Sequence, residues 1–352
     1  FGARHPESRP DPAELWERVD LISHYGVHWA LDRSNPGFLL AVIEPDSERV
    51  ILLDRRSDNP VEIDDVGGHG SRAALFRTPS GIDFMSSEGY QRFVVADRGN
   101  HRLQMFEVRR RPEARVIRES WIIALVRTVD LEELMKETPD WESEIPLKPG
   151  AVACLDSGVI AVADEANGRI LLLDERFKPL GTLGEKTPLV GPLAIAADGD
   201  GILIADTGGG DILRWSLDGS RQTLVDGQSP WDPQPKNAVM PSGVARHPDG
   251  SILWTDAFGG RLFRTEMGGQ TILLLGSQDS SEASSLRTES GELFRPGAVQ
   301  VSADGSVWVV DHGNHRGVVI DPEGVIRHFG SGPYLPTKVA EETSGTRKNG
   351  ES

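Results

Sequence analysis

The stretch "VVADRGNHRLQMF", Val94–Phe106, returns near the other end of the chain as "VVDHGNHRGVVI", Val309–Ile320. Both copies read Asp-x-Gly-Asn-His-Arg, with an apolar run before and after. This pattern predicts a strand, a tight loop and a second strand, because Gly and Asn supply the positive φ angles that such loops need. A loop that is written twice indicates a repeated structural unit, so further copies are expected.

Four looser copies complete a set of six. The acidic residues at the ends of the apolar runs are Glu44, Asp97, Asp164, Asp206, Asp256 and Asp311, and arginines follow five positions later at Arg49, Arg102, Arg169, Arg261 and Arg316. Successive acids are 53, 67, 42, 50 and 55 residues apart. Upstream of each acid, a turn leads into a short apolar strand, as in "TPSGIDF" at Thr78–Phe84. About four strands in a unit of this length are typical of a propeller blade.

We therefore predict an all-β fold, a six-bladed β-propeller of four-stranded antiparallel blades, over residues 22–330. The blades are expected at about 22–66, 74–127, 148–185, 190–226, 239–276 and 294–330, with an insertion at 109–147. Residues 1–21 form an N-terminal extension, in which "DPAELWERV" predicts a short helix. The tail at 331–352 is polar and lacks apolar periodicity, so it is expected to be disordered.

The unit "P-x-G-I…V-A-D-x-G-N-H-R" resembles the NHL repeat, over about residues 22–330. Asp97–Arg102 and Asp311–Arg316 are the copies that match the family pattern well. The resemblance implies a six-bladed propeller, in a family that includes protein-binding modules, RNA-binding domains, sensor domains and a peptide-amidating lyase. That lyase carries metal-binding histidines next to the turns that enter each blade. The corresponding positions here are Ser80, Gly150, Ser242 and Gly297.

Composition narrows the classes of partner. The net charge is −17 and the pI is about 5.0, the opposite sign to that of proteins that grip phosphate backbones, so no nucleic-acid partner is expected. No stretch approaches the roughly 18 apolar residues of a transmembrane segment. The single cysteine, Cys154, excludes an intramolecular disulfide, and its strand-like context predicts burial. The first residue is Phe, which fits either a removed export signal or trimming; a periplasmic or extracellular location is slightly favoured over a cytoplasmic one.

The repeated acid and arginine have a structural interpretation. The acid ends one strand and the arginine begins the next, so the two can pair across the loop between them. Six similar loops indicate architecture rather than six active sites, and His101 and His315 are expected to cap these loops. In blade four Asp211 replaces the arginine. Asp206 and Asp211 are therefore candidates for a cation site or, as we favour, part of a tight solvated loop, because two carboxylates alone bind calcium poorly.

A binding site is expected on the channel-mouth face, where the connections into the inner strands meet the loops after the second strands. The candidate ligand-binding or partner-binding residues on this face are Tyr25, Ser80, Arg98, Trp231, Ser242 and Phe258. Trp231 is flanked by prolines and is suited either to stacking on a ligand or to packing on a neighbouring blade. "WIIALV" predicts the outer strand of blade two, and "DLEELMKE" at Asp130–Glu137 predicts a capped helix beside the mouth.

One basic cluster stands out in this acidic chain. It consists of Arg109, Arg110, Arg111, Arg115 and Arg118, at the predicted turn between the two outer strands of blade two. It is suited to docking an acidic partner, or equally to protecting an exposed edge strand from pairing with another chain.

The function expected from these patterns is that of a non-enzymatic NHL-type propeller, which binds a protein or other ligand through the channel-mouth face as a subunit of a larger assembly. The alternative is a metal-dependent lyase or lactonase-type hydrolase with calcium or zinc at the axis. Its candidate residues are His24, His28, Asp83 and His312. No serine-hydrolase elbow, P-loop or zinc-protease motif is present. The sequence does not determine the oligomeric state.

Overall fold

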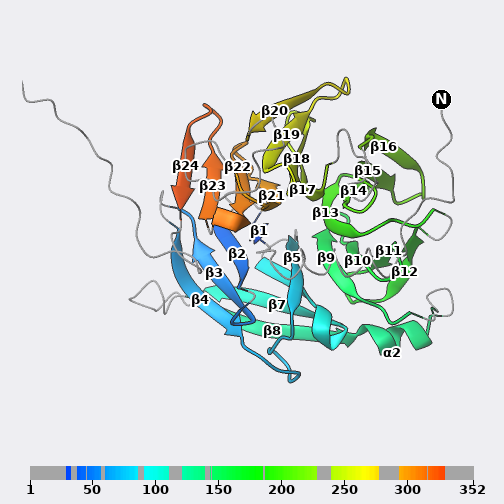
Figure 1. The fold of residues 1–352 in the computed structure, drawn as a ribbon. Helices are drawn as coiled ribbons and strands as arrows, with labels where there is room; N and C mark the ends of the chain where they lie inside the picture. Colours follow the sequence, from blue (N-terminus) through cyan, green and yellow to red (C-terminus); the bar gives the residue numbers. More distant parts are fainter. Residues whose placement is uncertain are drawn as a thin grey trace, which may run out of the picture.

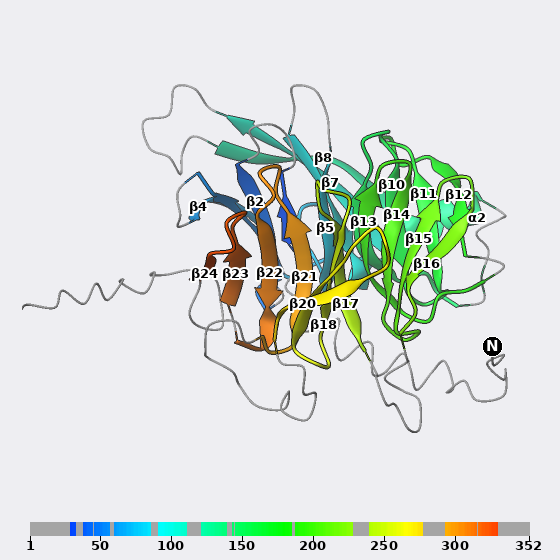
Figure 2. The same cartoon turned by 90° about the horizontal axis from the view of Figure 1, so that it is seen from above.

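The computed structural model describes residues 29–32, 38–44, 46–56, 60–85, 91–110, 121–138, 143, 145–184, 187–227, 239–276, 293–314 and 316–329. Six four-stranded antiparallel sheets are arranged around a common centre (Figure 1), and they stand side by side in the turned view of Figure 2. The predicted fold class, a six-bladed all-β propeller, is confirmed. The predicted N-terminal helix and C-terminal tail lie outside the described residues.

Each blade is one continuous stretch of chain, with its strands in sequence order from the centre outward. Blade one consists of β1 (Trp29–Leu31), β2 (Leu39–Glu44), β3 (Arg49–Asp54) and β4 (Val61–Gly67). Blade two consists of β5 (Pro79–Met85), β6 (Gln91–Asp97), β7 (Arg102–Arg110) and β8 (Trp121–Asp130). Blade three consists of β9 (Pro149–Cys154), β10 (Ile160–Asp164), β11 (Arg169–Leu173) and β12 (Pro179–Leu183).

The second half of the ring follows the same plan. Blade four consists of β13 (Pro192–Asp198), β14 (Gly201–Asp206), β15 (Asp211–Ser216) and β16 (Arg221–Val225). Blade five consists of β17 (Pro241–Arg246), β18 (Ile252–Asp256), β19 (Arg261–Thr265) and β20 (Thr271–Leu275). Blade six consists of β21 (Pro296–Val301), β22 (Val307–Asp311), β23 (Arg316–Ile320) and β24 (Ile326–Phe329).

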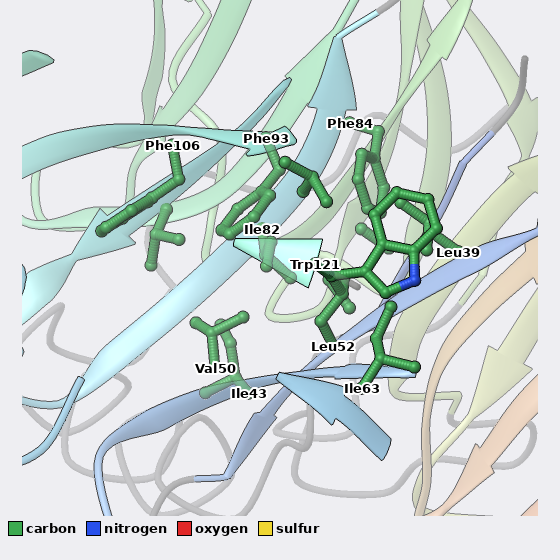
Figure 3. Close-up of a cluster of buried hydrophobic side chains, with 14 of the residues drawn as sticks. Leu39, Ile43, Val50, Leu52, Ile63, Ile82, Phe84, Phe93, Phe106 and Trp121 are labelled. Atoms are coloured by element: carbon green, nitrogen blue, oxygen red, sulfur yellow. The ribbon is translucent and has the colours of Figure 1, made fainter. Parts of the chain in front are cut away.

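The core lies between the blades, because both faces of each sheet are covered by neighbours. Figure 3 shows one such cluster, in which Ile43 and Leu52 of blade one meet Ile82 and Phe93 of blade two. The Phe93 ring stacks on that of Phe106, with 5.3 Å between the ring centroids. Strands buried on both faces are apolar at successive positions rather than at alternate ones. This explains the continuous apolar runs before and after each acid in the sequence.

The strands around the insertion in blade two are longer than predicted. The outer strand β8 continues to Asp130, beyond the "WIIALV" segment, and Arg109 and Arg110 belong to strand β7. The following helix α2 (Leu131–Lys136) begins as predicted, because the Asp130 side chain accepts hydrogen bonds from two amides of its first turn. It was expected over the rim beside the channel mouth. It lies at the outer edge of the ring (Figure 1), where Leu131 N donates to His101 O of a mouth loop and the Leu131 side chain packs into the core between blades two and three.

Among the described strands, none is shared between the two ends of the chain to close the ring. Blade six meets blade one through Gln300, whose side-chain Oε1 accepts a hydrogen bond from Leu31 N at 2.6 Å and whose Nε2 donates to Trp29 O at 2.8 Å. The amide side chain therefore pairs with the free edge of β1 as a strand would. Trp29 and Trp308 meet edge to face in the same seam, with 6.4 Å between the ring centroids.

Replacement of Gln300 by alanine is expected to lower the free energy of unfolding by about 1 to 3 kcal/mol, because two main-chain groups at the seam lose their partner. Urea unfolding measures the change, and hydrogen exchange of the Leu31 amide locates it. Gln222→Ala, at an exposed position of β16, is the control and is expected to stay within about 0.5 kcal/mol. Equal effects of the two substitutions would contradict a closing role for Gln300.

Candidate functional site

The repeated acids anchor the loops of the channel-mouth face. Asp97 accepts hydrogen bonds from Arg77 N at 2.7 Å, Asn100 Nδ2 at 2.9 Å and Arg102 Nε at 2.7 Å. Asp164, Asp256 and Asp311 also bind the amide that precedes their inner strand and the arginine of their own loop. Burial raises the pKa of Asp97 and Asp164, and the hydrogen bonds from the amides, asparagines and arginines oppose that rise. The repeat thus fastens each blade internally.

The two copies of Asp-x-Gly-Asn-His-Arg form a loop type that the middle blades do not share. Their loops contain the 3₁₀ turns η2 (Arg98–Asn100) and η6 (His312–Asn314). In η6, Gly313 N donates to Phe294 O at 2.7 Å, and a Cβ on Gly313 would lie 2.2 Å from the Phe294 ring. Only glycine fits this approach. The residues before the entry prolines of these two blades, Thr78 and Arg295, both have left-handed φ angles, of 48° and 49°.

Blade four shows what replaces the missing arginine. Asp206 and Asp211 lie opposite each other in the β14–β15 register. Asp206 Oδ1 accepts a hydrogen bond from Val190 N, and Asp211 Oδ1 accepts one from Gly227 N. Within the described ranges, no three His, Cys, Asp or Glu side chains are grouped as metal ligands. Both carboxylates bind main-chain amides, as carboxylates do in a tight loop.

Several side chains that were predicted to line the mouth join one blade to the next. Ser80 Oγ donates to Pro149 O at 3.0 Å, and Ser242 Oγ donates to Pro296 O at 2.7 Å. Deeper in the ring, Asp83 accepts hydrogen bonds from Cys154 N at 2.8 Å and from Phe84 N at 3.0 Å. Cys154 is buried in β9, as its context predicted. These groups are therefore engaged in interblade contacts.

A buried ion pair joins blades two and three at the mouth. Arg98 Nη2 lies 2.7 Å from Glu165 Oε2, and the two side chains are 5% and 2% exposed. Glu165 fits there because residue 150 is a glycine: a Cβ on Gly150 would lie 2.2 Å from the Glu165 carboxylate. Sequence reasoning placed Arg98 at the mouth but missed this pairing, because the two residues are 67 positions apart.

Residues of all six inner strands line a cavity of about 100 Å³. Its apolar lining includes Ile82, Val152 and Val244, and Arg246 lies in the lining as well. Asp198 binds the Arg246 guanidinium through both carboxylate oxygens, each at 2.6 Å. Burial alone raises the pKa of Asp198, but the hydrogen bonds from Arg246 and Arg214 hold it below its usual value. A cavity of this size admits a few water molecules or a small side chain.

The predicted axial metal residues are not brought together by the described structure. Asp83 lies within the inner strand of blade two, whereas His312 belongs to a mouth loop of blade six. His24, Tyr25, His28 and Trp231, together with Arg111, Arg115, Arg118 and His315, lie outside the described residues. The other two members of the basic cluster end strand β7. There Arg109 pairs with the buried Glu107, which also binds Arg92, while Arg110 is exposed.

Among the predicted mouth residues that the structure describes, Phe258 is the one with a large exposed apolar side chain. Phe258 follows the acid of blade five by two positions, and its side chain is 52% exposed. The equivalent positions in the other blades carry Asp46, Gly99, Ala166, Gly208 and Gly313. Exposed Arg295 precedes the entry proline of the next blade, and sequence reasoning missed it. Comparison of the six turns before the inner strands would have singled it out, because only this copy places an arginine directly before the proline.

No protein-family model matches the sequence, and no curated protein matches it either. Solved structures do match the fold. Virginiamycin B lyase from Staphylococcus aureus has a TM-score of 0.53 at 11% identity, over 90% of this chain and 86% of that chain. A chain of the nidogen–laminin complex has a TM-score of 0.54 at 13% identity, over 83% of this chain and 93% of that chain.

A Bacteroides thetaiotaomicron protein of unknown function is similar as well, with a TM-score of 0.52 at 14% identity, over 85% of this chain and 68% of that chain. At these identities the similarity shows the propeller fold alone. Propellers carry many unrelated activities, so the function has to be inferred from the residues of the site rather than from the fold. None of the described helices is long and apolar enough to span a membrane.

Proposed function

We propose that this propeller is a binding module of the NHL type, which docks a partner protein on its channel-mouth face as part of a larger assembly. The observation that carries the proposal is the exposure of Phe258 on a face where the equivalent residues are small or charged. A large exposed aromatic side chain among compact loops is a common anchor of protein interfaces. The Asp-x-Gly-Asn-His-Arg loops of blades two and six support kinship with NHL repeats.

The polar side chains of the mouth support binding rather than chemistry. Ser80, Ser242 and Asp83 bind the main chain, and Arg98 is neutralised by Glu165. A catalytic acid, base or nucleophile needs a polar atom directed at a substrate. These groups instead make the mouth rigid, and a rigid face lowers the entropic cost of docking a partner.

Substitution of Phe258 by serine is expected to weaken capture of the partner at least about fivefold, because truncation of an interface anchor costs more than 1 kcal/mol. The measurement is quantitative capture from native extract on immobilised wild type and variants. Met267→Ser is the matched control, since Met267 is 85% exposed at the opposite end of β19. A set of captured proteins that Met267→Ser loses and Phe258→Ser retains would place the interface on the other face.

A further inference from the structure

Phe258 belongs to a patch that spans two blades. Its loop packs against the segment that leads into blade six, because a Cβ on Gly260 would lie 2.5 Å from Leu293 O. Phe294 and Arg295 follow Leu293 directly, and Gly313 N donates to Phe294 O, which ties the His312 loop to the same turn. We define the blade-five/six patch as Phe258, Arg295 and His312.

Arg295 gives this patch a positive charge. The residue is exposed, it has a left-handed φ of 49°, and its guanidinium lies 5.4 Å from the centroid of the neighbouring Phe294 ring. Across the described residues, Arg295 forms no ion pair. Thr78 has nearly the same φ at the equivalent position of blade two, so this angle belongs to the loop type, and what distinguishes Arg295 is its exposed guanidinium.

The acids of the same two loops do not cancel this charge. Asp256 and Asp311 are fully buried, and each is paired with the arginine of its own loop, Arg261 and Arg316. The loop of blade five and the turn before blade six, which meet at Gly260 and Leu293, therefore present one exposed aromatic ring and one exposed guanidinium. This combination suits a carboxylate next to an apolar side chain, because a guanidinium binds a carboxylate through two parallel hydrogen bonds.

We propose that the blade-five/six patch recognises an acidic segment of a partner protein, with a carboxylate on Arg295 and an adjacent apolar side chain on Phe258. This inference rests on the proposed function and names the chemistry of its partner. The net charge of −17 makes non-specific binding of an acidic peptide unfavourable. Binding of such a peptide would therefore report a local site.

The probe is the capped peptide Glu-Leu-Glu-Glu-Leu-Glu, titrated into the full chain by calorimetry, with Lys-Leu-Lys-Lys-Leu-Lys as the charge-reversed peptide. We expect the acidic peptide alone to bind, and Arg295→Ala and Phe258→Ser each to weaken it about tenfold. The controls are Arg327→Ala, an arginine on the outer strand of the same blade, and Met267→Ser; both should stay within about twofold.

The inference is overturned if the acidic peptide fails to bind at about 1 mM. It is also overturned if the lysine peptide binds as well, or if the controls weaken binding as much as the patch variants. Should the peptide fail while Phe258→Ser still abolishes capture of a partner, the acidic specificity is wrong and the proposed function stands. Loss of peptide binding in both patch variants, with urea unfolding unchanged, supports the inference.

Discussion

Replacement of Asp97 by asparagine is expected to lower the free energy of unfolding by about 3 to 5 kcal/mol, the range for breaking one member of a buried ion pair. Asp97 is fully buried, and every group around its carboxylate donates: Arg77 N, Asn100 Nδ2 and Arg102 Nε. An amide of the same shape would direct its own NH₂ at these donors and leave Arg102 without a negative partner. Urea unfolding at pH 7 measures the loss.

The matched control is Glu44→Gln, the same change in blade one. Glu44 is 11% exposed and pairs with Arg49, whose side chain is 40% exposed. Water can therefore hydrate the Arg49 guanidinium after it loses its negative partner. We expect a cost below about 1 kcal/mol there. If both substitutions cost the same, burial is not what makes the repeat structural, and the acids would have to be examined as binding groups.

Replacement of Glu165 by alanine is expected to cost about as much, 3 to 5 kcal/mol, because it removes the carboxylate that neutralises Arg98 inside the mouth. Both members are almost fully buried, and they join separate blades. The same urea measurement applies, and thermal unfolding should show the loss as a lower Tm.

A double-mutant cycle measures the interaction free energy between Arg98 and Glu165 apart from their contacts with other residues. Arg98→Met with Glu165→Ala removes both charges together, and it should restore part of the stability lost by Glu165→Ala alone. Arg49→Ala, which breaks a pair whose arginine is 40% exposed, is the control with an expected cost below about 1 kcal/mol. Additive single effects in the cycle would mean that Arg98 and Glu165 contribute independently, contrary to the contact between them.

The propeller architecture could be predicted from the sequence because the residues that mark it lie close together in the chain. An acid and an arginine five positions apart flank one loop, and the register places them opposite each other, as in Asp97–Arg102 and Asp311–Arg316. A turn with proline before an apolar run likewise marks the start of five of the six inner strands. Each feature occurs in five of the six units, so a weak copy such as that of blade four is recognised from the others.

The contacts between blades could not be predicted from the sequence, because the two residues of each contact lie far apart in the chain. Asp83 binds Cys154, 71 positions away, and Arg98 binds Glu165, 67 positions away. Ser80 therefore read as a candidate ligand-binding residue, although its hydroxyl holds the next blade. The packing of helix α2 was not predicted for the same reason, because Leu131 contacts side chains of two blades that are far apart in the chain.

The absence of a shared strand in the described ring bears on how the chain is made. Each sheet contains only neighbouring hairpins, so a blade can complete its hydrogen bonds as soon as its own four strands have left the ribosome. The Gln300 contacts, by contrast, span 269 and 271 positions. Translation therefore completes the hydrogen-bonding partners of each blade in turn, but the apolar faces of a blade are covered only when its neighbours are present. The edge of β1 gains its Gln300 contacts only near the end of synthesis.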